Sequence, residues 1–355
     1  MALPAMHYCF LTVSTLDAAN LIRAREMGRA LIRQGVRVSY IVEDHPVNRA
    51  FKDLDPAATV EYVTDPRRLG QFGRRRKLVK QLRPDFVEVL NPHPKTLLPI
   101  WWPIAETKIV AMWDEPMVLK PLRLVKRIYE ERLAKSLIRR ADYHLAATQT
   151  LQRKLKERYG IDAIYMPHAA YLPQYPPVTS PFDQPTAVYM GNLYPLFDHD
   201  VIFEAAKLLA REGKGPPIEI IGHGPEQERW QRFISENRLD NVKLLGYMSG
   251  VELWRRLRHA QVLLFPIRET LANLTRCPSK TFAYAQAQRP TITNRVGEVA
   301  QVLGEKATYV ECAPEAFARA IERAMAGPLA DVDYQVERQN WDDRAAALIR
   351  ALSGH

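Results

Sequence analysis

Residues 218–230, IEIIGHGPEQERW, carry the pattern that decides the fold of this 355-residue chain. The run Ile218–Ile221 predicts a short buried strand, and the residues after the turn predict a helix. The turn itself contains Gly222, His223 and Gly224. Glycine has no Cβ atom, so the backbone of such a turn can approach a ligand closely, although a tight turn without a ligand has the same composition. The stretch therefore predicts one strand-turn-helix step of an α/β sheet and three candidate ligand contacts.

The same step repeats along the rest of the chain. In the second half, the apolar runs predict strands at residues 186–190, 243–245, 261–265, 291–293 and 308–310, with helices that begin near residues 199, 226, 250, 279 and 314. In the first half, they predict strands at residues 7–13, 36–42, 86–90, 109–112 and 144–147, with a helix over residues 18–34 that Gly35 ends. Strands that alternate with helices in this way indicate parallel sheets covered by helices on both faces.

Residues 172–185, LPQYPPVTSPFDQP, interrupt the alternation with five prolines and no periodic pattern. They predict a linker between a first domain of residues 1–171 and a second domain of residues 186–330. We expect residues 331–355, with a helix around Trp341, to return to the first domain. The expected architecture is α/β, with two doubly wound, Rossmann-like domains that face each other across a cleft, where ligands of such sheets usually bind.

The positive charge of the chain is confined to its first half. Residues 1–170 contain 29 Lys and Arg against 18 Asp and Glu, whereas the remainder contains 21 against 22. This one-sided excess suggests an anionic partner for the first domain, namely a membrane, a phosphorylated acceptor or a nucleic acid, although a merely soluble basic surface has the same composition. Aromatic residues are not interleaved with the charges as a nucleic-acid stacking platform requires, so we expect no nucleic-acid partner.

Cysteine usage and the apolar runs indicate a cytoplasmic protein. Cys9, Cys277 and Cys312 are far apart and lack metal-ligand spacing, so we expect reduced thiols and neither a disulfide nor a zinc site. The first residues lack the basic start and long apolar run of a signal peptide. The longest nearly apolar stretch, residues 97–105, contains two prolines and is too short to span a bilayer.

Basic segments of the first half suit the surface of an anionic membrane. Residues 67–80 contain seven Lys and Arg and no acidic residue, and residues 120–127 add four more at the start of a helix whose other face is apolar. Residues 97–102 add two tryptophans. In basic amphipathic segments of this kind each Lys or Arg contributes about 1 kcal/mol to binding of anionic headgroups. A peripheral position on the inner face of the cytoplasmic membrane is therefore one alternative, and a solvated face with buried tryptophans is the other.

Several stretches of the chain resemble family 4 glycosyltransferases. In the second half these are AVYMGNL at residues 187–193, IEIIGHGPEQERW at 218–230, NVKLLGYMSGVELWRRLRHAQVLLFPI at 241–267 and PSKTFAYAQAQRPTITNRVGEV at 278–299. In the first half RPDFVEVLNPHP, KIVAMWDEP and RADYHLAATQTLQRKL resemble the acceptor domain of the same family in order and spacing. The resemblance covers nearly the whole chain, and it implies the GT-B fold and transfer of a sugar from a nucleotide-diphosphate donor.

The chain departs from the family pattern at several donor positions. The paired glutamates of the family would fall at Thr275 and Ala283, and its arginine after the first glycine of the donor domain falls at Asn192. The glycine-rich loop after the first strand is replaced by Ser14 to Ala18. The resemblance therefore leaves open which sugar is transferred and whether its anomeric configuration is retained or inverted.

The expected donor contacts lie at strand ends and helix starts of the second domain. Ser279 and Lys280 begin a helix, so backbone N–H groups and one ammonium could converge on the diphosphate, with a solvated lysine as the alternative. Glu298 could bind the ribose hydroxyls in place of the missing glutamate, or be an exposed carboxylate at a helix start. With the resemblance, the full set of expected nucleotide-sugar contacts is Gly191, Asn192, Gly222, His223, Gly224, Tyr247, Met248, Ser279, Lys280, Tyr284 and Glu298.

No cofactor or metal ion is expected. Residues 198–200, Asp-His-Asp, match the Asp-x-Asp metal motif of another glycosyltransferase fold, but they introduce a periodic apolar helix. We therefore expect Asp198 to cap that helix. The donor is a substrate rather than a cofactor, with UDP expected in preference to GDP, and we expect a metal-independent transferase of the hexosyl or glycuronosyl type.

An inverting transfer needs a general base near the acceptor hydroxyl. Asp114 follows a predicted strand, where relatives with this fold have a catalytic or sugar-contacting His or Asp. Asp17, at the first strand-to-helix junction, is the competing candidate, with a helix cap as its alternative role. His93 and His168 also follow strands and are candidates on the acceptor side, although a lone histidine at such a place is more often structural.

The expected function is transfer of a sugar from a nucleotide-diphosphate sugar to a hydroxyl of a lipid-linked or anionic acceptor, in glycan or polysaccharide synthesis. A sugar-nucleotide epimerase or a phosphorylase-like enzyme would keep the same fold. A non-catalytic sugar-nucleotide-binding protein would account for the missing glutamates. The fold alone does not separate these alternatives, because function depends on the site.

Overall fold

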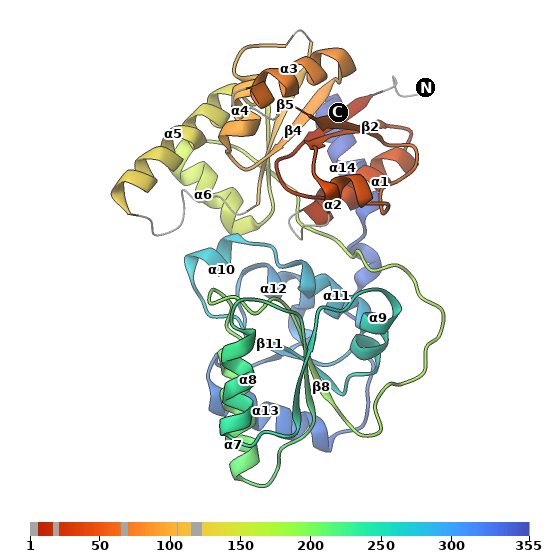
Figure 1. Ribbon diagram of the computed structural model, residues 1–355, viewed down its shortest axis with the longest axis vertical. Coiled ribbons are helices and arrows are strands. Elements are labelled where there is room, and N and C mark those ends of the chain that lie inside the picture. The colour runs from red at the N-terminus through yellow and green to blue at the C-terminus, as the bar shows by residue number, and fades with distance from the viewer. Residues whose placement is uncertain (1–5, 17–20, 65–69, 105, 115–122, 355) are drawn as a thin grey trace. The chain divides into compact units, whose positions relative to one another are not determined.

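The computed structural model consists of two compact α/β units and describes residues 6–16, 21–64, 70–104, 106–114 and 123–354 (Figure 1). Unit 1 comprises residues 1–171, 274–277 and 339–355, and unit 2 comprises residues 172–273 and 278–338. The division falls at the start of the proline-rich segment, which groups with unit 2 instead of standing between two domains. The return to unit 1 occurs at residue 339, whereas we expected it at residue 331.

Unit 1 is built on a parallel sheet of seven strands. In spatial order these are β3 (Thr59–Val63), β2 (Arg37–Glu43), β1 (His7–Leu11), β4 (Phe86–Leu90), β5 (Lys108–Trp113), β6 (Tyr143–Ala146) and β7 (Ile164–Tyr165). Every residue of β1 is buried, and so is every residue of β5 except Lys108. Such strands read as continuous apolar runs because helices exclude water from both faces of a parallel sheet.

The helices of unit 1 are α1 (Ile22–Arg33), α2 (Pro46–Ala50), α3 (Gly70–Leu82), α4 (Pro94–Ile100), α5 (Leu124–Arg140), α6 (Gln149–Tyr159) and α14 (Trp341–Ser353). The C-terminal helix α14 packs against α1, and the Arg33 guanidinium lies 2.7 Å from the Asp342 carboxylate. Trp341, the first residue of α14, is buried, and its ring meets the ring of His168 edge to face. The last helix of the chain therefore completes the core of unit 1.

Unit 2 is built on a parallel sheet of six strands. In spatial order these are β10 (Val242–Gly246), β9 (Ile218–Ile221), β8 (Ala187–Met190), β11 (Val262–Phe265), β12 (Thr291–Thr293) and β13 (Thr308–Tyr309). Ile218 of β9 lies opposite Ala187 of β8 and opposite Val242 of β10. The predicted strand at residues 218–221 is thus a buried strand with neighbours on both sides.

The helical elements of unit 2 are α7 (Asp200–Arg211), α8 (Gln227–Glu236), α9 (Gly250–His259), α11 (Ser279–Ala287), α12 (Gly297–Leu303), η3 (Gly304–Lys306), α13 (Pro314–Ala326) and η4 (Val336–Arg338). α10 (Leu271–Thr275) is divided between the two units after Asn273. The amphipathic helix α7 buries Phe203, whose ring stacks on that of Trp230 from α8 at 4.2 Å and an interplanar angle of 3°. This aromatic pair joins two helices to the core of the unit.

The expected fold class, α/β with two doubly wound sheets, is confirmed. The ends of the predicted strands agree with the observed ones to within two residues. β3 and β7 were not predicted. β3 is mostly half-buried at the edge of the sheet and β7 has two residues, so neither gives a continuous apolar run.

Candidate functional site

The loops that carry the predicted donor contacts lie at one edge of the unit 2 sheet. In a parallel sheet all strands end at the same edge. Gly191 follows β8, Gly222 follows β9 and Tyr247 follows β10, and these three strands are neighbours. The structure therefore brings three loops together that are far apart in the sequence.

Gly222 and Gly224 are required by the packing of these loops on one another. Gly222 has a φ of +140°, and a Cβ atom there would overlap the carbonyl group of Gly191. A Cβ atom on Gly224 would overlap the backbone of Leu193. The Gly222 N–H donates to the Gly246 carbonyl at 2.7 Å. The close approach that we expected between these glycines and a ligand is thus made by the backbone of the protein itself, and their contact with the donor stays a prediction.

Lys280 lies in the first turn of α11, where aromatic rings position its ammonium. Nζ donates to Tyr189 Oη at 3.2 Å. It lies 4.4 Å from the ring centroid of Tyr189 and 4.6 Å from that of Phe265. A Cβ atom on Gly191 would overlap Nζ, so the ammonium needs a glycine at the end of β8. The aromatic faces attract the cation, and with the Tyr189 hydroxyl they hold the ammonium at the start of a helix.

Tyr284 is a structural residue, which corrects our expectation that it contacts the nucleotide sugar. Its side chain is 0 % exposed. Its hydroxyl accepts a hydrogen bond from the Met190 N–H at 2.8 Å and donates one to the Leu264 carbonyl at 3.1 Å. These bonds tie the end of β8 to β11, so the neighbouring strands use the hydroxyl and cover the ring.

The remaining predicted donor contacts differ in exposure. Tyr247 is 72 % exposed, and its ring meets the exposed ring of His223 edge to face, with centroids 5.9 Å apart. Asn192 is exposed, while Met248 and Ser279 are half-buried. Tyr247 therefore offers an accessible aromatic face beside the glycine turn, which is a suitable surface for a nucleobase.

The positions of the family glutamates hold small buried residues. Thr275 and Ala283 are both buried, and neither side chain carries the acidic group that the family has at these positions. Glu298, in the first turn of α12, is 2 % exposed. Its burial excludes the alternative of an exposed carboxylate, and its contact with the ribose stays a prediction.

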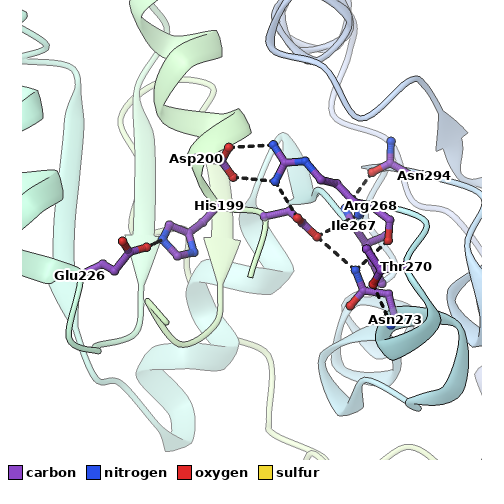
Figure 2. A network of polar contacts seen from close by, with 9 residues as sticks. His199, Asp200, Glu226, Ile267, Arg268, Thr270, Asn273 and Asn294 are labelled. Carbon is purple, nitrogen blue, oxygen red and sulfur yellow. Dashed lines mark hydrogen bonds and ion pairs between the residues drawn. The ribbon is translucent and has the colours of Figure 1, made fainter. Parts of the chain in front are cut away.

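Figure 2 shows a network around Arg268 that includes the Asp-His-Asp sequence. Arg268 Nη1 donates to Asp198 Oδ1 at 2.7 Å, and Nη2 donates to Asp200 Oδ2 at 2.7 Å. The Arg268 N–H and the Asn273 amide also donate to Asp198. Burial raises the pKa of Asp200, but the hydrogen bond and the charge of Arg268 together lower it by more than burial raises it. The pKa of this carboxyl therefore lies below its usual range. Both carboxylates therefore bind one arginine from the loop after β11.

Asp198 is not the cap of α7, contrary to our expectation. His199 occupies the N-cap position, and it makes no capping hydrogen bond. The Asp198 carboxylate instead accepts hydrogen bonds from the loop 70 residues further along the chain. His199 Nε2 lies 3.0 Å from Glu226 Oε2, and burial lowers the pKa of the imidazole despite this carboxylate. Asp198 and Asp200 thus bind the loop after β11 to the start of α7.

In unit 1, the structure brings Asp114 and His168 together. Asp114 follows β5, and its N–H donates to Asn91 Oδ1 at 3.0 Å. Asp114 Oδ1 lies 3.8 Å from His168 Nε2. The Asp114 side chain is 16 % exposed, so its carboxylate is partly accessible. Asp17, the competing candidate for the general base, lies outside the described residues.

Unit 1 contains a pocket of about 410 Å³ at the carboxyl ends of β1 and β4. Residues 11–14 at the end of β1 and residues 90–94 and 96 from the end of β4 into α4 form two of its walls. Tyr129, Glu130 and Leu133 of α5 form a third, and Glu130 is the one charged residue among the described residues of the lining. Asn91 is one of the lining residues, and its amide oxygen binds the Asp114 N–H. The candidate base therefore adjoins the pocket.

His93 lines this pocket and also caps α4. Its Nδ1 accepts a hydrogen bond from the Lys95 N–H at 3.1 Å, which places the ring proton on Nε2. Burial lowers the pKa of the imidazole, and the positive charges of Lys95 and Arg75 lower it further. His93 is thus a neutral hydrogen-bond donor in the wall of the pocket.

The sequence analysis missed Glu43 and Lys95 and counted Arg75 only within a basic segment. Glu43 Oε1 accepts from Lys95 Nζ at 2.6 Å and from Arg75 Nη2 at 3.2 Å. Glu43 ends β2, and Lys95 follows the end of β4 in the first turn of a helix. Charged residues at the carboxyl ends of predicted parallel strands were the signal that could have found this cluster.

Two further observations concern metals and membranes. Among the residues that the structure describes, no group of three or more His, Cys, Asp and Glu side chains could hold a metal ion. Within the same part of the chain, every helix is too short or too polar to cross a membrane.

Comparisons with known proteins identify both halves of the chain. Residues 22–167 match the family model described as Glycosyltransferase Family 4, and residues 184–326 match the model described as Glycosyl transferases group 1. No curated protein sequence matches the chain significantly.

Several solved structures are similar over nearly the whole chain. A sucrose-phosphate synthase from Thermosynechococcus elongatus has a TM-score of 0.77 at 15% identity, and 98% of each chain is covered. Anabaena Alr3699/HepE in complex with UDP-glucose has a TM-score of 0.74 at 14% identity, with 99% of this chain and 100% of that chain covered. A glycosyltransferase from Rickettsia africae has a TM-score of 0.72 at 12% identity, with 98% of each chain covered. Since the matched models account for most of both units, the chain belongs to the group 1 and family 4 glycosyltransferases of the GT-B fold.

Proposed function

We propose that the chain transfers a hexosyl or glycuronosyl group from a UDP-sugar to a hydroxyl of a lipid-linked or anionic acceptor, in glycan or polysaccharide synthesis and without a metal ion. Sugar transfer is the activity of the family, and the nucleotide, the acceptor and the pathway are the proposal. The choice of UDP is supported by the similar fold of the Anabaena protein, whose structure contains UDP-glucose.

The observation that carries the proposal is the position of Lys280. Its ammonium lies over the end of β8, at the start of α11 and beside the loops after β8 and β9. A diphosphate at this edge would meet a lysine charge and the N-terminal end of a helix, which together stabilise anionic oxygens. The nucleobase would then lie toward Tyr247, the exposed aromatic residue after β10.

Asp114 is proposed as the general base if the transfer inverts the anomeric configuration. Its carboxylate is partly accessible, and His168 lies 3.8 Å from it. The carboxylate would accept the proton of the acceptor hydroxyl as that oxygen attacks the anomeric carbon, while the UDP phosphate leaves with the electron pair of the broken bond. If the transfer retains configuration, Asp114 is proposed to bind a sugar hydroxyl instead.

A membrane surface is proposed as the place where a lipid-linked acceptor is met. Residues 123–129, which include the first turns of α5, are all exposed, and Val125 is 81 % exposed. This segment combines Arg and Lys residues with four exposed apolar side chains, namely Leu124, Val125, Ile128 and Tyr129. Apolar side chains flanked by basic ones suit the headgroup layer of an anionic bilayer.

The tryptophans after α4 lie beside the C-terminal end of α5, near Arg139 and Arg140. Trp101 and Trp102 are exposed, so the alternative of buried tryptophans is wrong. Arg76 Nη1 donates to the carbonyls of Pro99 and Trp102, both at 2.9 Å. The guanidinium thus fixes the turn that presents the two rings, and tryptophan is enriched where protein meets lipid headgroups.

The test is turnover of radiolabelled UDP-sugars by the full chain, with and without lipid-linked and phosphorylated acceptors. We expect label to appear in an acceptor and UDP to be released in equal amount. Interconversion of the labelled sugar nucleotide without acceptor would indicate an epimerase. UDP-sugar binding with neither transfer nor interconversion would indicate a binding protein. Failure to bind UDP or any UDP-sugar would contradict the proposal altogether.

A further inference from the structure

A second pocket of unit 1 lies between the C-terminal ends of α4 and α5. Its volume is about 220 Å³, and it is lined by Leu97, Trp101, Ser136, Arg139 and Arg140. α4 leads from β4 to β5 and α5 leads to β6, so both helices end at the amino edge of the parallel sheet. The five residues of β4 separate this edge from the carboxyl edge by about 15 Å. The proposed sugar transfer therefore does not use this pocket.

The described residues of the lining carry two positive charges and no negative one. Arg140 Nε donates to the Ile100 carbonyl at 2.5 Å, which ties the guanidinium to the end of α4 and leaves its two Nη groups for a ligand. Arg139 is exposed, and within the part of the chain that the structure describes it has no hydrogen-bond or ion-pair partner. Two guanidiniums without a carboxylate between them suit a phosphate, because each planar fork matches two of its oxygens.

The same pocket has an apolar wall that is open to solvent. Trp101 forms this wall and is 47 % exposed, and the next residue, Trp102, is 63 % exposed. A small phosphate ester leaves such rings in water, whereas a phospholipid brings the boundary between headgroups and acyl chains to them. Tryptophan is enriched at this boundary. The pairing of arginines with exposed indoles therefore favours a lipid phosphate over a soluble one.

The exposed face of α5 continues from the pocket toward the start of the helix. Its residues at helical spacing, all exposed, are Val125, Ile128, Arg132, Lys135 and Arg139. They form one strip about 21 Å long that contains no acidic residue. A second copy of the chain would bring like charges together along this strip. An anionic bilayer complements both the basic and the apolar part.

We infer that the pocket between α4 and α5 binds the phosphate of an anionic phospholipid, with the guanidiniums of Arg139 and Arg140 on the phosphate oxygens and Trp101 against the glycerol backbone. The inference rests on the membrane surface of the proposed function and names its specific ligand. α5 then lies along the headgroup layer, with Val125 and Ile128 at the other end of the strip. A zwitterionic lipid binds less well, because its ammonium group is repelled by the two arginines.

The experiment is sedimentation of the full chain with vesicles of phosphatidylcholine, with and without phosphatidylglycerol. We expect the wild-type chain to bind the mixed vesicles more tightly. Arg139→Lys should raise the Kd for the mixed vesicles about three- to tenfold, because the charge stays while the fork is lost. Arg132→Lys makes the same change on the same face of α5 but outside the pocket, and it should leave the Kd unchanged. A surface that acts by charge alone would respond to neither substitution.

Two further measurements identify the source of the phosphate. Glycerol 3-phosphate should release no more protein from the mixed vesicles than sodium chloride at the same ionic strength, because it offers no apolar contact to the tryptophans. Phospholipids with brominated acyl chains should quench the tryptophan fluorescence of the wild-type chain. The double variant Trp101→Phe, Trp102→Phe should lose this quenching.

The inference is overturned if Arg139→Lys binds the mixed vesicles as wild type does, or if Arg132→Lys weakens binding as much as Arg139→Lys. Release by glycerol 3-phosphate beyond the effect of salt also overturns it, since the site then takes a soluble phosphate. UDP affinity is measured on the same samples. Normal UDP binding together with any of these results refutes the inference alone, whereas a wild-type chain that binds no UDP refutes the proposed sugar transfer.

Discussion

The two units use the same parallel sheet differently at its carboxyl edge. In unit 2 the loops after β8 and β9 pack backbone against backbone at Gly222 and Gly224, and Lys280 is held against aromatic rings. In unit 1 the loop after β1 begins with side chains instead of glycines, and a pocket of about 410 Å³ lies between β1 and β4. The comparison teaches that the topology supplies an edge for ligands, while the loops decide whether backbone or side chains form the site.

The units also differ in how their charges are used. In unit 2 arginines are paired with carboxylates across loops, as Arg268 is with Asp198 and Asp200. Unit 1 keeps a surplus of positive charge, and its exposed basic residues surround apolar ones on α5. This surplus favours an anionic partner for unit 1 but not for the surface of unit 2.

The sharpest test of the comparison is removal of the candidate base of unit 1. Asp114→Asn should lower turnover by roughly two to four powers of ten, because the amide does not accept the proton of the acceptor hydroxyl. The affinity for UDP, measured by calorimetry, should not change, since the donor loops belong to unit 2. Asp162→Asn, at an exposed carboxylate of unit 1, is the control. Turnover of Asp114→Asn within about threefold of wild type would discard the base assignment.

The glycine packing of unit 2 can be broken by a single methyl group. Gly222→Ala places a Cβ at a φ of +140° against the Gly191 carbonyl and should destabilise unit 2 by about 3 kcal/mol. Gly73→Ala in α3 of unit 1, where nothing lies within 4 Å of the new Cβ, should instead stabilise its helix by about 0.5–1 kcal/mol. Urea unfolding of both variants measures the difference. A free energy of unfolding for Gly222→Ala equal to that of wild type would show that the loops tolerate a side chain at this position.

The proposed contact between the Lys280 ammonium of unit 2 and the donor diphosphate is tested with Lys280→Ala. Loss of a charged hydrogen bond to the diphosphate should weaken UDP binding by about 1.5–3 kcal/mol. Gly191→Ala should weaken it in the same direction without removing the charge, because the new Cβ displaces Nζ. Lys243→Ala, at an exposed lysine of β10, is the matched control for calorimetric titration with UDP and GDP. An unchanged affinity in Lys280→Ala rules out its role.

The surface of α5 should bind anionic vesicles, and unit 2 should contribute nothing to this binding. Val125→Asp should weaken association by about 1–2 kcal/mol, since it replaces an exposed apolar side chain with a negative charge. Leu329→Asp makes the same kind of change on unit 2 and should have no effect. Sedimentation with anionic and neutral vesicles is the measurement, and salt should release the protein because charges are screened beyond about 8–10 Å. Equal sedimentation with both kinds of vesicle would refute this prediction.

Acidification should destabilise unit 1 more than unit 2. Burial lowers the pKa of His7, His93 and His144 in unit 1 and of His199 in unit 2. An unfolded chain takes up these protons near pH 6.5, so stability is complete above this value and falls as the pH drops through it toward the lowered pKa values. Hydrogen exchange of peptides from each unit at pH 7.5 and pH 5.5 reports the two stabilities separately. A larger loss of protection in unit 2 would contradict the prediction.

The strands and the fold class could be predicted from the sequence because their signal is local. A strand buried on both faces must be an apolar run, and Ile218–Ile221 shows such a run apart from Glu219. Lys280 at a helix start was predicted for the same reason, since position in a helix is read from neighbouring residues. The edge strand β3 was missed because a half-buried strand has no such run.

The parts of the site that were missed depend on residues distant in the sequence. A carboxylate at a helix start looks like a cap, but Asp198 binds Arg268 because the loop after β11 lies at the start of α7. Tyr284 follows the binding motif of the family, yet strands β8 and β11 consume its hydroxyl. No local pattern states which partner a polar group will find.

By itself, the sequence determined that this chain has two parallel α/β sheets, that its positive charge lies in the first half, and that glycines and a lysine lie at strand ends of the second. Only the tertiary structure decided that Gly222 packs on Gly191 and that Glu43, Lys95 and Arg75 form one charged cluster. The physical reason is how far apart along the chain the interacting residues lie. Strand and helix formation depend on the burial of neighbouring residues, whereas a site depends on distances between side chains that only the packing of the sheets fixes.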